Sequence, residues 1–229
     1  MSDKMYPIKP WSFSGIKTYE TCPTKYKAEK VTKEVPYTDT DATIYGKDIH
    51  KACEDFIATN VPLPGKYSYI QPVMDSIKAM PGEKFVEQQF GVSKEGGRLS
   101  LCDFDSPNVW FRGVADLVII NGKEATVFDY KSSKNTKYAD TRQLALMAAA
   151  VFLKYPEVEV VKAGLIFLVC NAVIKAKYTR DRRFDIFAQL DELLQQREVS
   201  YNTGVFNPKP NGLCKNWCKV HSCPHNGSY

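Results

Sequence analysis

The feature that most constrains the fold is a short apolar run that ends in two opposite charges. Residues 126–131 read Thr-Val-Phe-Asp-Tyr-Lys, and their apolar start predicts a buried strand. Side chains alternate along a strand, so Asp129 and Lys131 point to the same side of the sheet. Two charges at the end of a buried strand are costly unless something uses them. The sequence therefore predicts a polar site where this strand ends.

A hairpin brings a second carboxylate to this strand end. Asn121-Gly122 is a strong turn signal between two strand patterns. If residue 120 pairs with residue 123, Asp116 falls near residue 127, and a shift of a residue or two would keep it within reach of Asp129. Two close carboxylates favour a cation, and oxygen ligands with open positions suit Mg²⁺ or Mn²⁺. With Lys131 alongside, the group indicates phosphodiester hydrolysis, whereas a plain Asp129–Lys131 ion pair is the structural alternative.

The periodicity of the chain predicts an α/β fold with a mixed sheet flanked by helices. A capping box at Asp140–Gln143 indicates that a helix begins there and runs to Pro156. We expect an N-terminal helical region at 1–82, a core at 83–206 and a cysteine-rich tail at 207–229, together forming one compact domain. Further helices are expected at 15–21 (capped by Ser14), 41–58, 68–80 and 183–199, and strands at 84–92, 109–120, 124–131, 162–170 and 172–179.

Charge and hydropathy narrow the class of protein. No apolar run is long enough to span a bilayer, and the first residues lack the apolar stretch of a signal peptide, so we expect a cytoplasmic protein with no membrane partner. The 31 basic and 26 acidic residues give a net charge of +5. Basic residues cluster at 25–33, 131–137 and 175–183, with tyrosines among them, which suits a phosphate backbone and stacked bases as well as a solvated surface.

Seven cysteines in a cytoplasmic chain indicate metal binding more than disulfides. Cys214, Cys218 and Cys223 are clustered in the tail, and a fourth ligand could come from Cys22, His221 or His225. Four thiolates suit a 4Fe–4S cluster, whereas three thiolates and a histidine suit zinc. Free cysteines in a mobile tail are the structural alternative. The other cysteines are expected to be small core residues: Cys53, Cys102 and Cys170.

The motifs resemble those of the PD-(D/E)XK nuclease superfamily. Gly-Val-Ala-Asp at 113–116 followed by Asp-Tyr-Lys at 129–131 is similar to its signature, in the form of the RecB-like branch. Four further segments are similar to motifs of that branch: the Ser- and Cys-Pro-containing helix motif at 12–23, the histidine motif at 46–50, the Gln-containing motif at 143–147, and the cysteine tail of AddB-type and CRISPR-associated RecB-like exonucleases.

This resemblance implies a restriction-endonuclease-like core and a set of roles. Lys131 would orient or activate water, and Gln143 would place Lys131 or DNA. Cys22 would join the three tail cysteines around a 4Fe–4S cluster that ties the tail to the N-terminal helix. The metal ligands would be His50, Asp116, Asp129, the backbone carbonyl of Tyr130 and, through water or a second metal, Glu87.

Structural alternatives accompany several of these roles. His50 could be an ordinary half-buried residue satisfied by Glu54, Gln143 could serve only the capping box, and Glu87 could lie on the surface. Two features depart from the family pattern. Met147 stands where the Gln-containing motif has a tyrosine, and the cysteine spacing is unusual, which keeps zinc as the alternative metal.

The function expected from these patterns is a metal-dependent DNA exonuclease of recombination, repair or phage DNA metabolism. No P-loop motor motif is present, so a helicase or recombination partner would be a separate chain. The alternative is a non-catalytic DNA-binding module with a structural metal cluster. A sequence-specific endonuclease would share the core but would need recognition loops, for which the chain has little room.

Overall fold

The computed structural model describes residues 5–228, and the predictions made for residues 1–4 and 229 lie outside this range. The chain divides into two compact units. Unit 1 combines Met1–Thr38 with Ala188–Tyr229, and unit 2 is Asp39–Phe187. These boundaries differ from the divisions at residues 82 and 206 that the sequence patterns indicate.

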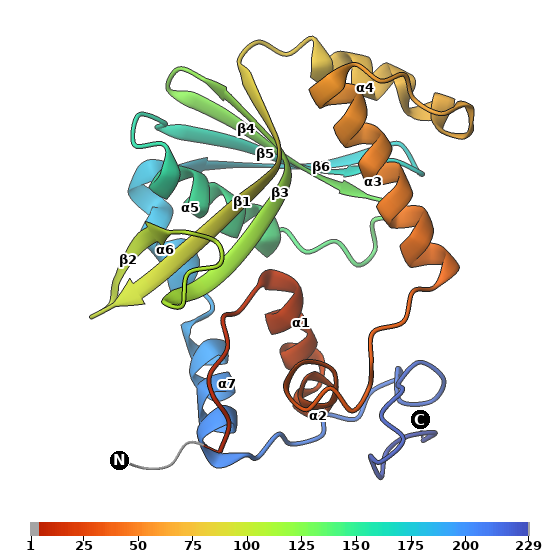
Figure 1. Cartoon of the computed structure of the whole chain (residues 1–229), viewed down its shortest axis with the longest axis vertical. Coiled ribbons are helices and arrows are strands. Elements are labelled where there is room, and N and C mark those ends of the chain that lie inside the picture. Colours follow the sequence, from red (N-terminus) through yellow and green to blue (C-terminus); the bar gives the residue numbers. More distant parts are fainter. Residues whose placement is uncertain (1–4, 229) are drawn as a thin grey trace. The chain divides into compact units, whose positions relative to one another are not determined.

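Unit 2 is built on one mixed sheet in the order β2-β1-β3-β4-β5-β6 (Figure 1). Neighbouring strands are antiparallel except β4 and β5, which run parallel. This sheet, flanked by helices, confirms the predicted α/β fold class. The short strand β2 was not predicted, although it follows the two-residue turn Gly96-Gly97, which is a hairpin signal. The strands are β1 (Glu83–Glu95), β2 (Arg98–Cys102), β3 (Val109–Asn121), β4 (Glu124–Lys131), β5 (Val160–Phe167) and β6 (Ala172–Thr179).

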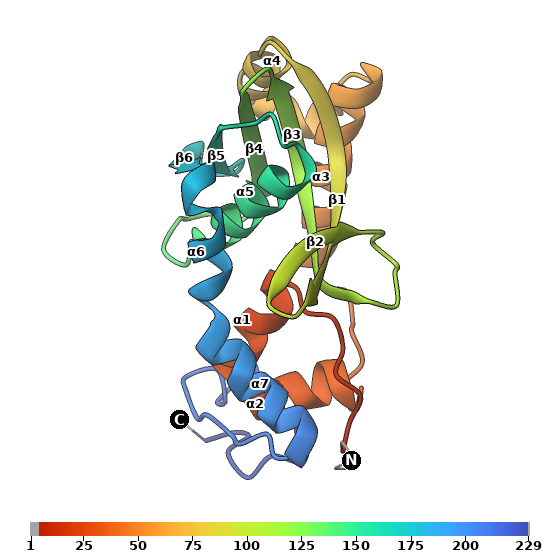
Figure 2. The same cartoon turned by 90° about the vertical axis from the view of Figure 1, so that its left-hand side faces the viewer.

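Helices cover both faces of this sheet, α5 on one side and α3 on the other (Figure 2). Helix α5 (Arg142–Lys154) is the crossover that a parallel β4–β5 pair requires, and its residues from Leu144 to Phe152 are all buried. On the other side α3 (Asp41–Thr59), the 3₁₀ segment η2 (Gly65–Ile70) and α4 (Gln71–Lys78) pack an apolar cluster against β3.

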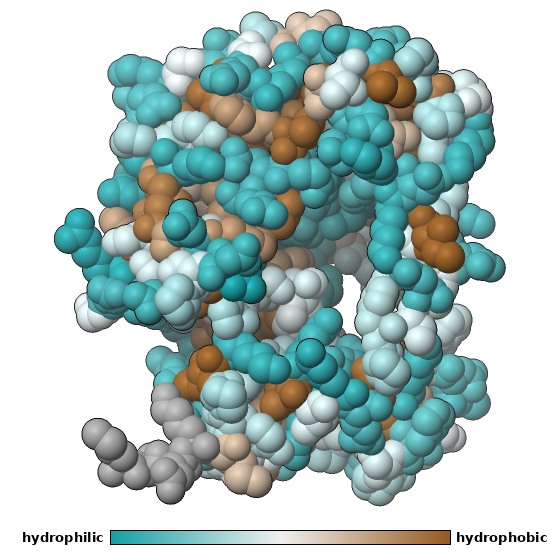
Figure 3. All heavy atoms as spheres, in the orientation of Figure 1, coloured by the Kyte–Doolittle hydropathy of each residue, from teal (hydrophilic) through white to brown (hydrophobic). Residues whose placement is uncertain are grey.

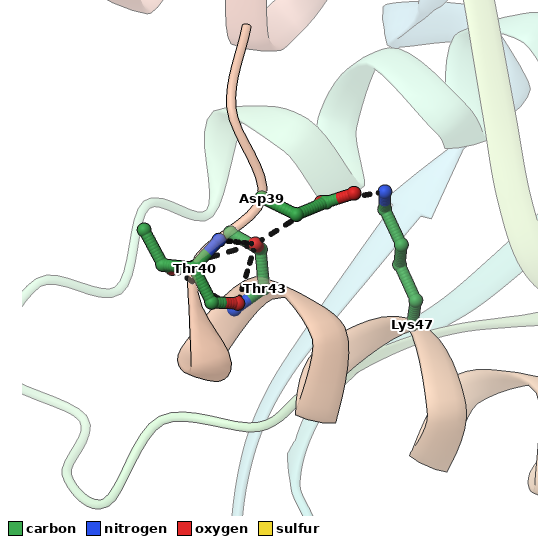
Figure 4. A network of polar contacts seen from close by, with 4 residues as sticks. All are labelled: Asp39, Thr40, Thr43 and Lys47. Atoms are coloured by element: carbon green, nitrogen blue, oxygen red, sulfur yellow. Dashed lines mark hydrogen bonds and ion pairs between the residues drawn. The ribbon is translucent and has the colours of Figure 1, made fainter.

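The beginning of α3 is fixed by a polar network (Figure 4). Thr40 is the N-cap, and its hydroxyl accepts a hydrogen bond from the backbone N–H of Thr43 at 3.3 Å. The hydroxyl of Thr43 accepts one from the backbone N–H of Thr40 at 2.7 Å, completing a capping box. Asp39 contacts both Thr43 and Lys47, at 3.2 and 2.7 Å. This anchoring gives the helix that carries His50 a defined starting point.

Unit 1 joins the two ends of the chain. Its interior is rich in aromatic rings, with Tyr19, Tyr26, Tyr201 and Phe206 in mutual edge or stacked contacts around the buried Arg197. Its helical elements are α1 (Phe13–Thr21), α2 (Pro23–Tyr26), the π-helical turn η1 (Lys27–Val31) and α7 (Asp191–Thr203).

Several local predictions were wrong in detail. Ser12, not Ser14, caps α1. The helix expected at 183–199 is two helices, α6 (Arg183–Ala188), preceded by the short η3 (Arg180–Arg182), and α7, because the chain leaves helical geometry after Ala188. Cys170, expected in the core, is exposed in the turn between β5 and β6.

Two further corrections concern the candidate site. The capping box at Asp140–Gln143 does not form, since Thr141 is the N-cap without a side-chain hydrogen bond and Asp140 binds Arg142 instead. The hairpin pairs Asn121 with Glu124, so Gly122 and Lys123 make the turn and Gly122 takes the left-handed conformation at a φ of 58°. Asp116 is therefore aligned with Asp129 rather than with residue 127.

The surface is mostly polar. In the face shown in Figure 3, hydrophobic residues form separate patches among predominantly hydrophilic ones. Within residues 5–228 no helix is both long enough and apolar enough to cross a membrane.

Candidate functional site

The candidate site forms where strands β3 and β4 part. Their ladder runs from Asn121↔Glu124 to Leu117↔Phe128 and ends immediately before Asp116 and Asp129. Beyond that point the carboxylate of Asp116 accepts the backbone N–H of Tyr130 at 2.5 Å. A side-chain oxygen thus replaces the ladder bond that β3 would have offered. The two predicted carboxylates, Asp116 and Asp129, therefore lie together where the β3–β4 ladder ends.

Lys131 and Gln143 complete a polar triangle with Asp129. The Lys131 ammonium lies 2.6 Å from Asp129 Oδ2 and donates to Gln143 Oε1 at 2.9 Å. The Gln143 amide donates through Nε2 to Asp129 Oδ1. An ammonium cannot accept and a carboxylate cannot donate, so these two contacts fix the orientation of the amide. Gln143 therefore serves this triangle and not the end of its helix.

His50 approaches from α3. Its Nδ1 lies 3.4 Å from Asp116 Oδ1, and its ring is edge-on to that of Tyr130 at a centroid distance of 5.9 Å. Glu54, the alternative partner one turn later, binds Lys51 instead at 3.1 Å. The helix thus delivers His50 to the second oxygen of the carboxylate that β3 provides.

Glu87 lies on the neighbouring strand at the level of Asp116. It falls between the pairs Val86↔Leu117 and Gln88↔Ala115, and its φ of 48° is unusual for a residue other than glycine. Burial, followed by the charges of Asp116 and Glu54, raises the pKa of Glu87. A strained backbone that keeps a carboxyl beside another carboxylate is typical of functional sites.

The site combines several negative charges with burial from water, and this combination shifts the pKa values of its side chains. Burial raises the pKa of Asp129 to about 6, helped by the charge of Asp116 and opposed by Lys131. Burial alone would lower the pKa of His50, but its hydrogen bond to Asp116 and the charges of Asp116 and Asp129 outweigh that effect and raise it. Both shifts indicate that this site favours additional positive charge.

The donor set suits a divalent cation, although no group of three or more His, Cys, Asp or Glu side chains in residues 5–228 is gathered closely enough to hold one. Asp129 Oδ2 is buried and receives no hydrogen bond of good geometry, although the Lys131 ammonium pairs with it. That ammonium offsets only part of the cost of burying the carboxylate, because the pKa of Asp129 stays raised. His50 Nδ1 and the oxygens of Asp116 and Asp129 are ligand types found for Mn²⁺ and Mg²⁺.

The four predicted cluster cysteines line one small cavity of unit 1, with a volume of about 20 Å³. Cys22 accepts the backbone N–H of Lys209 at 3.5 Å, and Cys214 accepts that of Asn211 at the same distance. None of the four is in a disulfide. His225 also lines the cavity, whereas His221 contacts Asn226 through Nδ1. The structure thus gathers thiols from both ends of the chain without the tight geometry of a formed metal site.

Some features of the site have no signal in the sequence. Met147 is 2 % exposed, and a Cβ at Gly113 would lie 2.5 Å from its terminal methyl group, so position 147 belongs to the core between α5 and β3. Cys53 is fully buried near Asp116, and burial and that charge raise the pKa of its thiol to about 12. The burial of Cys53 confirms its expected place in the core, whereas the role of Met147 could not be read from an apolar pattern alone.

Comparison with known proteins identifies the family of the chain. The model of the PD-(D/E)XK nuclease superfamily matches residues 10–80 and 73–224. No curated protein matches the sequence.

Two solved structures are similar in fold. One, from Eubacterium rectale and described as a candidate exonuclease, has a TM-score of 0.50 and 13 % identity, covering 91 % of this chain and 86 % of its own. The other, named SSO0001, has a TM-score of 0.48 and 15 % identity over 98 % and 90 %. With its family model matched over most of its length, the chain belongs to the PD-(D/E)XK nuclease superfamily.

Proposed function

We propose that the chain is a divalent-metal-dependent deoxyribonuclease acting as an exonuclease, with Asp116, Asp129 and Lys131 at its active site. The observation that carries this proposal is the convergence of the three groups where β3 and β4 part. Asp116 bonds the backbone N–H of Tyr130, and Lys131 pairs with Asp129 at 2.6 Å. Membership of a nuclease superfamily supports the reaction class.

Lys131 has the central part in this mechanism. Its ammonium can donate a hydrogen bond to an attacking water and offset negative charge that builds up on the phosphate. Gln143 holds that ammonium through Oε1 at 2.9 Å and holds Asp129 through its amide nitrogen. Gln143 is thus a positioning residue that keeps the lysine and the carboxylate in register, as effective catalysis requires.

The cation would be held by His50 Nδ1, by carboxylate oxygens of Asp116 and Asp129, and by the backbone carbonyl of Tyr130. Glu87 would contribute through water. When bound, Mg²⁺ or Mn²⁺ would supply Lewis-acid stabilisation of the charge on the scissile phosphate. A cation held there would take over from Lys131 the neutralisation of Asp129 and would offset the excess negative charge of the site, leaving the ammonium free to contact the water.

The test is cleavage of end-labelled single-stranded and duplex DNA with Mg²⁺ or Mn²⁺. Lys131→Ala is expected to lose activity by about a hundredfold or more. The matched control is Lys123→Ala at the opposite end of β4, where the lysine is 75 % exposed and pairs with Glu159. Full activity of Lys131→Ala rejects the mechanism. The position of the label reports the polarity of digestion, and internal cuts in a circular strand would reject the exonuclease assignment.

We also propose that Cys22, Cys214, Cys218 and Cys223 hold a 4Fe–4S cluster that joins the ends of unit 1. The four thiols line one cavity, which supports this, since four thiolates are the usual ligands of such a cluster. Zinc with three thiolates and His225 is the alternative. Anaerobically purified protein should contain iron and sulfide and absorb visible light. Colourless protein with one zinc per chain would favour the alternative.

The expected partner is DNA, in recombination, repair or phage DNA metabolism. A DNA-binding module without activity is the competing function. Binding of DNA by both the wild-type protein and Lys131→Ala, with cleavage by neither under any metal condition, would favour that module. Cleavage by the wild type alone favours the enzyme.

A further inference from the structure

The loop between β4 and α5, residues 132–141, is tied to the candidate site at both ends. Lys131 precedes it and Gln143 follows it, and these two side chains are joined at 2.9 Å. The loop also approaches α3, because Ser132 Oγ would lie 3.2 Å from a Cβ at Gly46. Gly46 is one turn before His50 on that helix. The loop therefore begins and ends at the site.

Hydrogen bonds within the loop give it a defined shape. The side chain of Asn135 accepts the backbone N–H of Lys137 at 3.1 Å, and Ala139 N donates to Thr136 O at 3.0 Å. At its end Asp140 binds Arg142 through both carboxylate oxygens, at 3.0 and 2.7 Å. These short-range bonds order the loop before any ligand arrives, so its outward-facing side chains are preorganised.

The loop exposes an aromatic side chain and two lysines to solvent. Tyr138 is 79 % exposed, the most exposed large hydrophobic side chain among residues 5–228. The ammonium of Lys137 lies 5.4 Å from the centre of its ring. Neither Lys134 nor Lys137 forms an ion pair with the described residues. An aromatic ring with one ammonium group near it and a second lysine on the same loop has the chemistry that binds a base and its flanking phosphates.

We propose that Tyr138, Lys134 and Lys137 bind the substrate strand next to the scissile phosphate, with one base stacked on the ring of Tyr138. This inference rests on the proposed nuclease function. A base can stack on a side chain only when it is unpaired, so the site would favour single strands or frayed ends over paired duplex. The loop thereby specifies which DNA reaches Lys131.

Binding is measured first, without cleavage, by fluorescence anisotropy of labelled single-stranded DNA in the presence of a chelator. Tyr138→Ala is expected to weaken binding about tenfold, whereas Tyr138→Phe keeps the ring and should bind as the wild type does. Phe184→Ala, which removes a ring that is 55 % exposed elsewhere in unit 2, is the matched control. Because no metal is present, this readout does not depend on the proposed catalysis.

A strand with a single abasic nucleotide, moved along the sequence, locates the stacked base. One abasic position should weaken binding to the wild type about tenfold and have no further effect on Tyr138→Ala. In cleavage assays Tyr138→Ala should raise KM with little change in kcat. Unchanged DNA binding by Tyr138→Ala overturns the proposal and would assign the loop to a protein partner. If Lys131→Ala binds DNA normally but no longer cleaves it, the catalytic role of Lys131 is supported independently of the role proposed for Tyr138.

Discussion

Among the described residues two charged side chains are buried, one in each compact unit, and their surroundings differ in kind. Arg197 in unit 1 is 3 % exposed, and Asp129 in unit 2 is 4 % exposed. Arg197 donates from Nε to the Tyr26 hydroxyl at 2.9 Å and from an Nη to Lys9 O at 2.7 Å. Its guanidinium also lies 4.7 Å from the ring centre of Tyr201.

Asp129 has fewer hydrogen-bond partners. One oxygen accepts the Gln143 amide, but the other receives no hydrogen bond of good geometry, and burial with the Asp116 charge raises the pKa of the carboxyl to about 6 despite Lys131. A buried charge with several permanent hydrogen-bond partners suits a structural role, whereas one with too few partners is suited to bind a ligand. The comparison therefore separates a structural charge from a functional one.

The largest expected effect is on activity. Asp129→Asn should lower kcat/KM about a thousandfold or more, because it removes a proposed cation ligand. The free energy of unfolding of the metal-free protein at neutral pH should stay equal or rise, because a costly buried charge is gone. Activity assays and urea unfolding with a chelator measure the two quantities. A large loss of stability would make Asp129 a structural residue like Arg197.

Replacing the structural charge should have the opposite signature. Arg197→Met is expected to lower the free energy of unfolding by about 3 kcal/mol, because Tyr26 and Lys9 lose a buried partner. Gln196→Met on the same helix is the control, since Gln196 is exposed. Urea unfolding checks both variants. An Arg197→Met protein as stable as the control would remove the contrast between the two charges.

The raised pKa of Asp129 predicts a pH dependence of stability. The folded-state value of about 6 exceeds the ordinary value of 3.8, so the folded protein holds this proton more tightly than the unfolded chain does. Its contribution is most favourable below about pH 4 and falls, by on the order of 3 kcal/mol, as the pH rises through about 6.

The difference between wild type and Asp129→Asn isolates this contribution. The wild type should lose stability relative to Asp129→Asn between about pH 4 and 6 in metal-free buffer. His50, whose pKa is raised from 6.5, is protonated in both states over most of this range and contributes little to the difference. If the difference in free energy of unfolding between the two proteins is the same at about pH 4 and about pH 6, the pKa of Asp129 is not raised in the folded protein.

The sequence predicted the central strands of this fold well. The strand 124–131 agrees with β4 at both ends, and the meeting of Asp116 with Asp129 follows from the hairpin, although the turn is one residue later than expected. These features depend on local signals, namely alternation and a turn glycine. Strand β2 also follows a turn glycine pair, Gly96-Gly97, and its signal was missed, whereas the break after Ala188 depends on tertiary packing and had no such signal.

The contacts of individual side chains were harder to predict. Gln143 carries both a helix-start signal and a family motif, and only the positions of Lys131 and Asp129 decide between them. Met147 stands where the family motif has a tyrosine, and its terminal methyl group fills the space left by Gly113. Space of that kind arises from two elements far apart in the chain, so one segment of sequence does not reveal it.

The smallest effect tests how redundant the partners of Arg197 are. Tyr201→Phe removes a hydroxyl that lies 3.1 Å from that of Tyr26 and 3.5 Å from an Nη of Arg197. The same Nη keeps its bond to Lys9 O, and the phenylalanine ring still faces the guanidinium. The free energy of unfolding should therefore fall by only about 1 kcal/mol. A loss as large as that of Arg197→Met would show that Arg197 depends on one partner, as Asp129 depends on Lys131, and the distinction between the two buried charges would disappear.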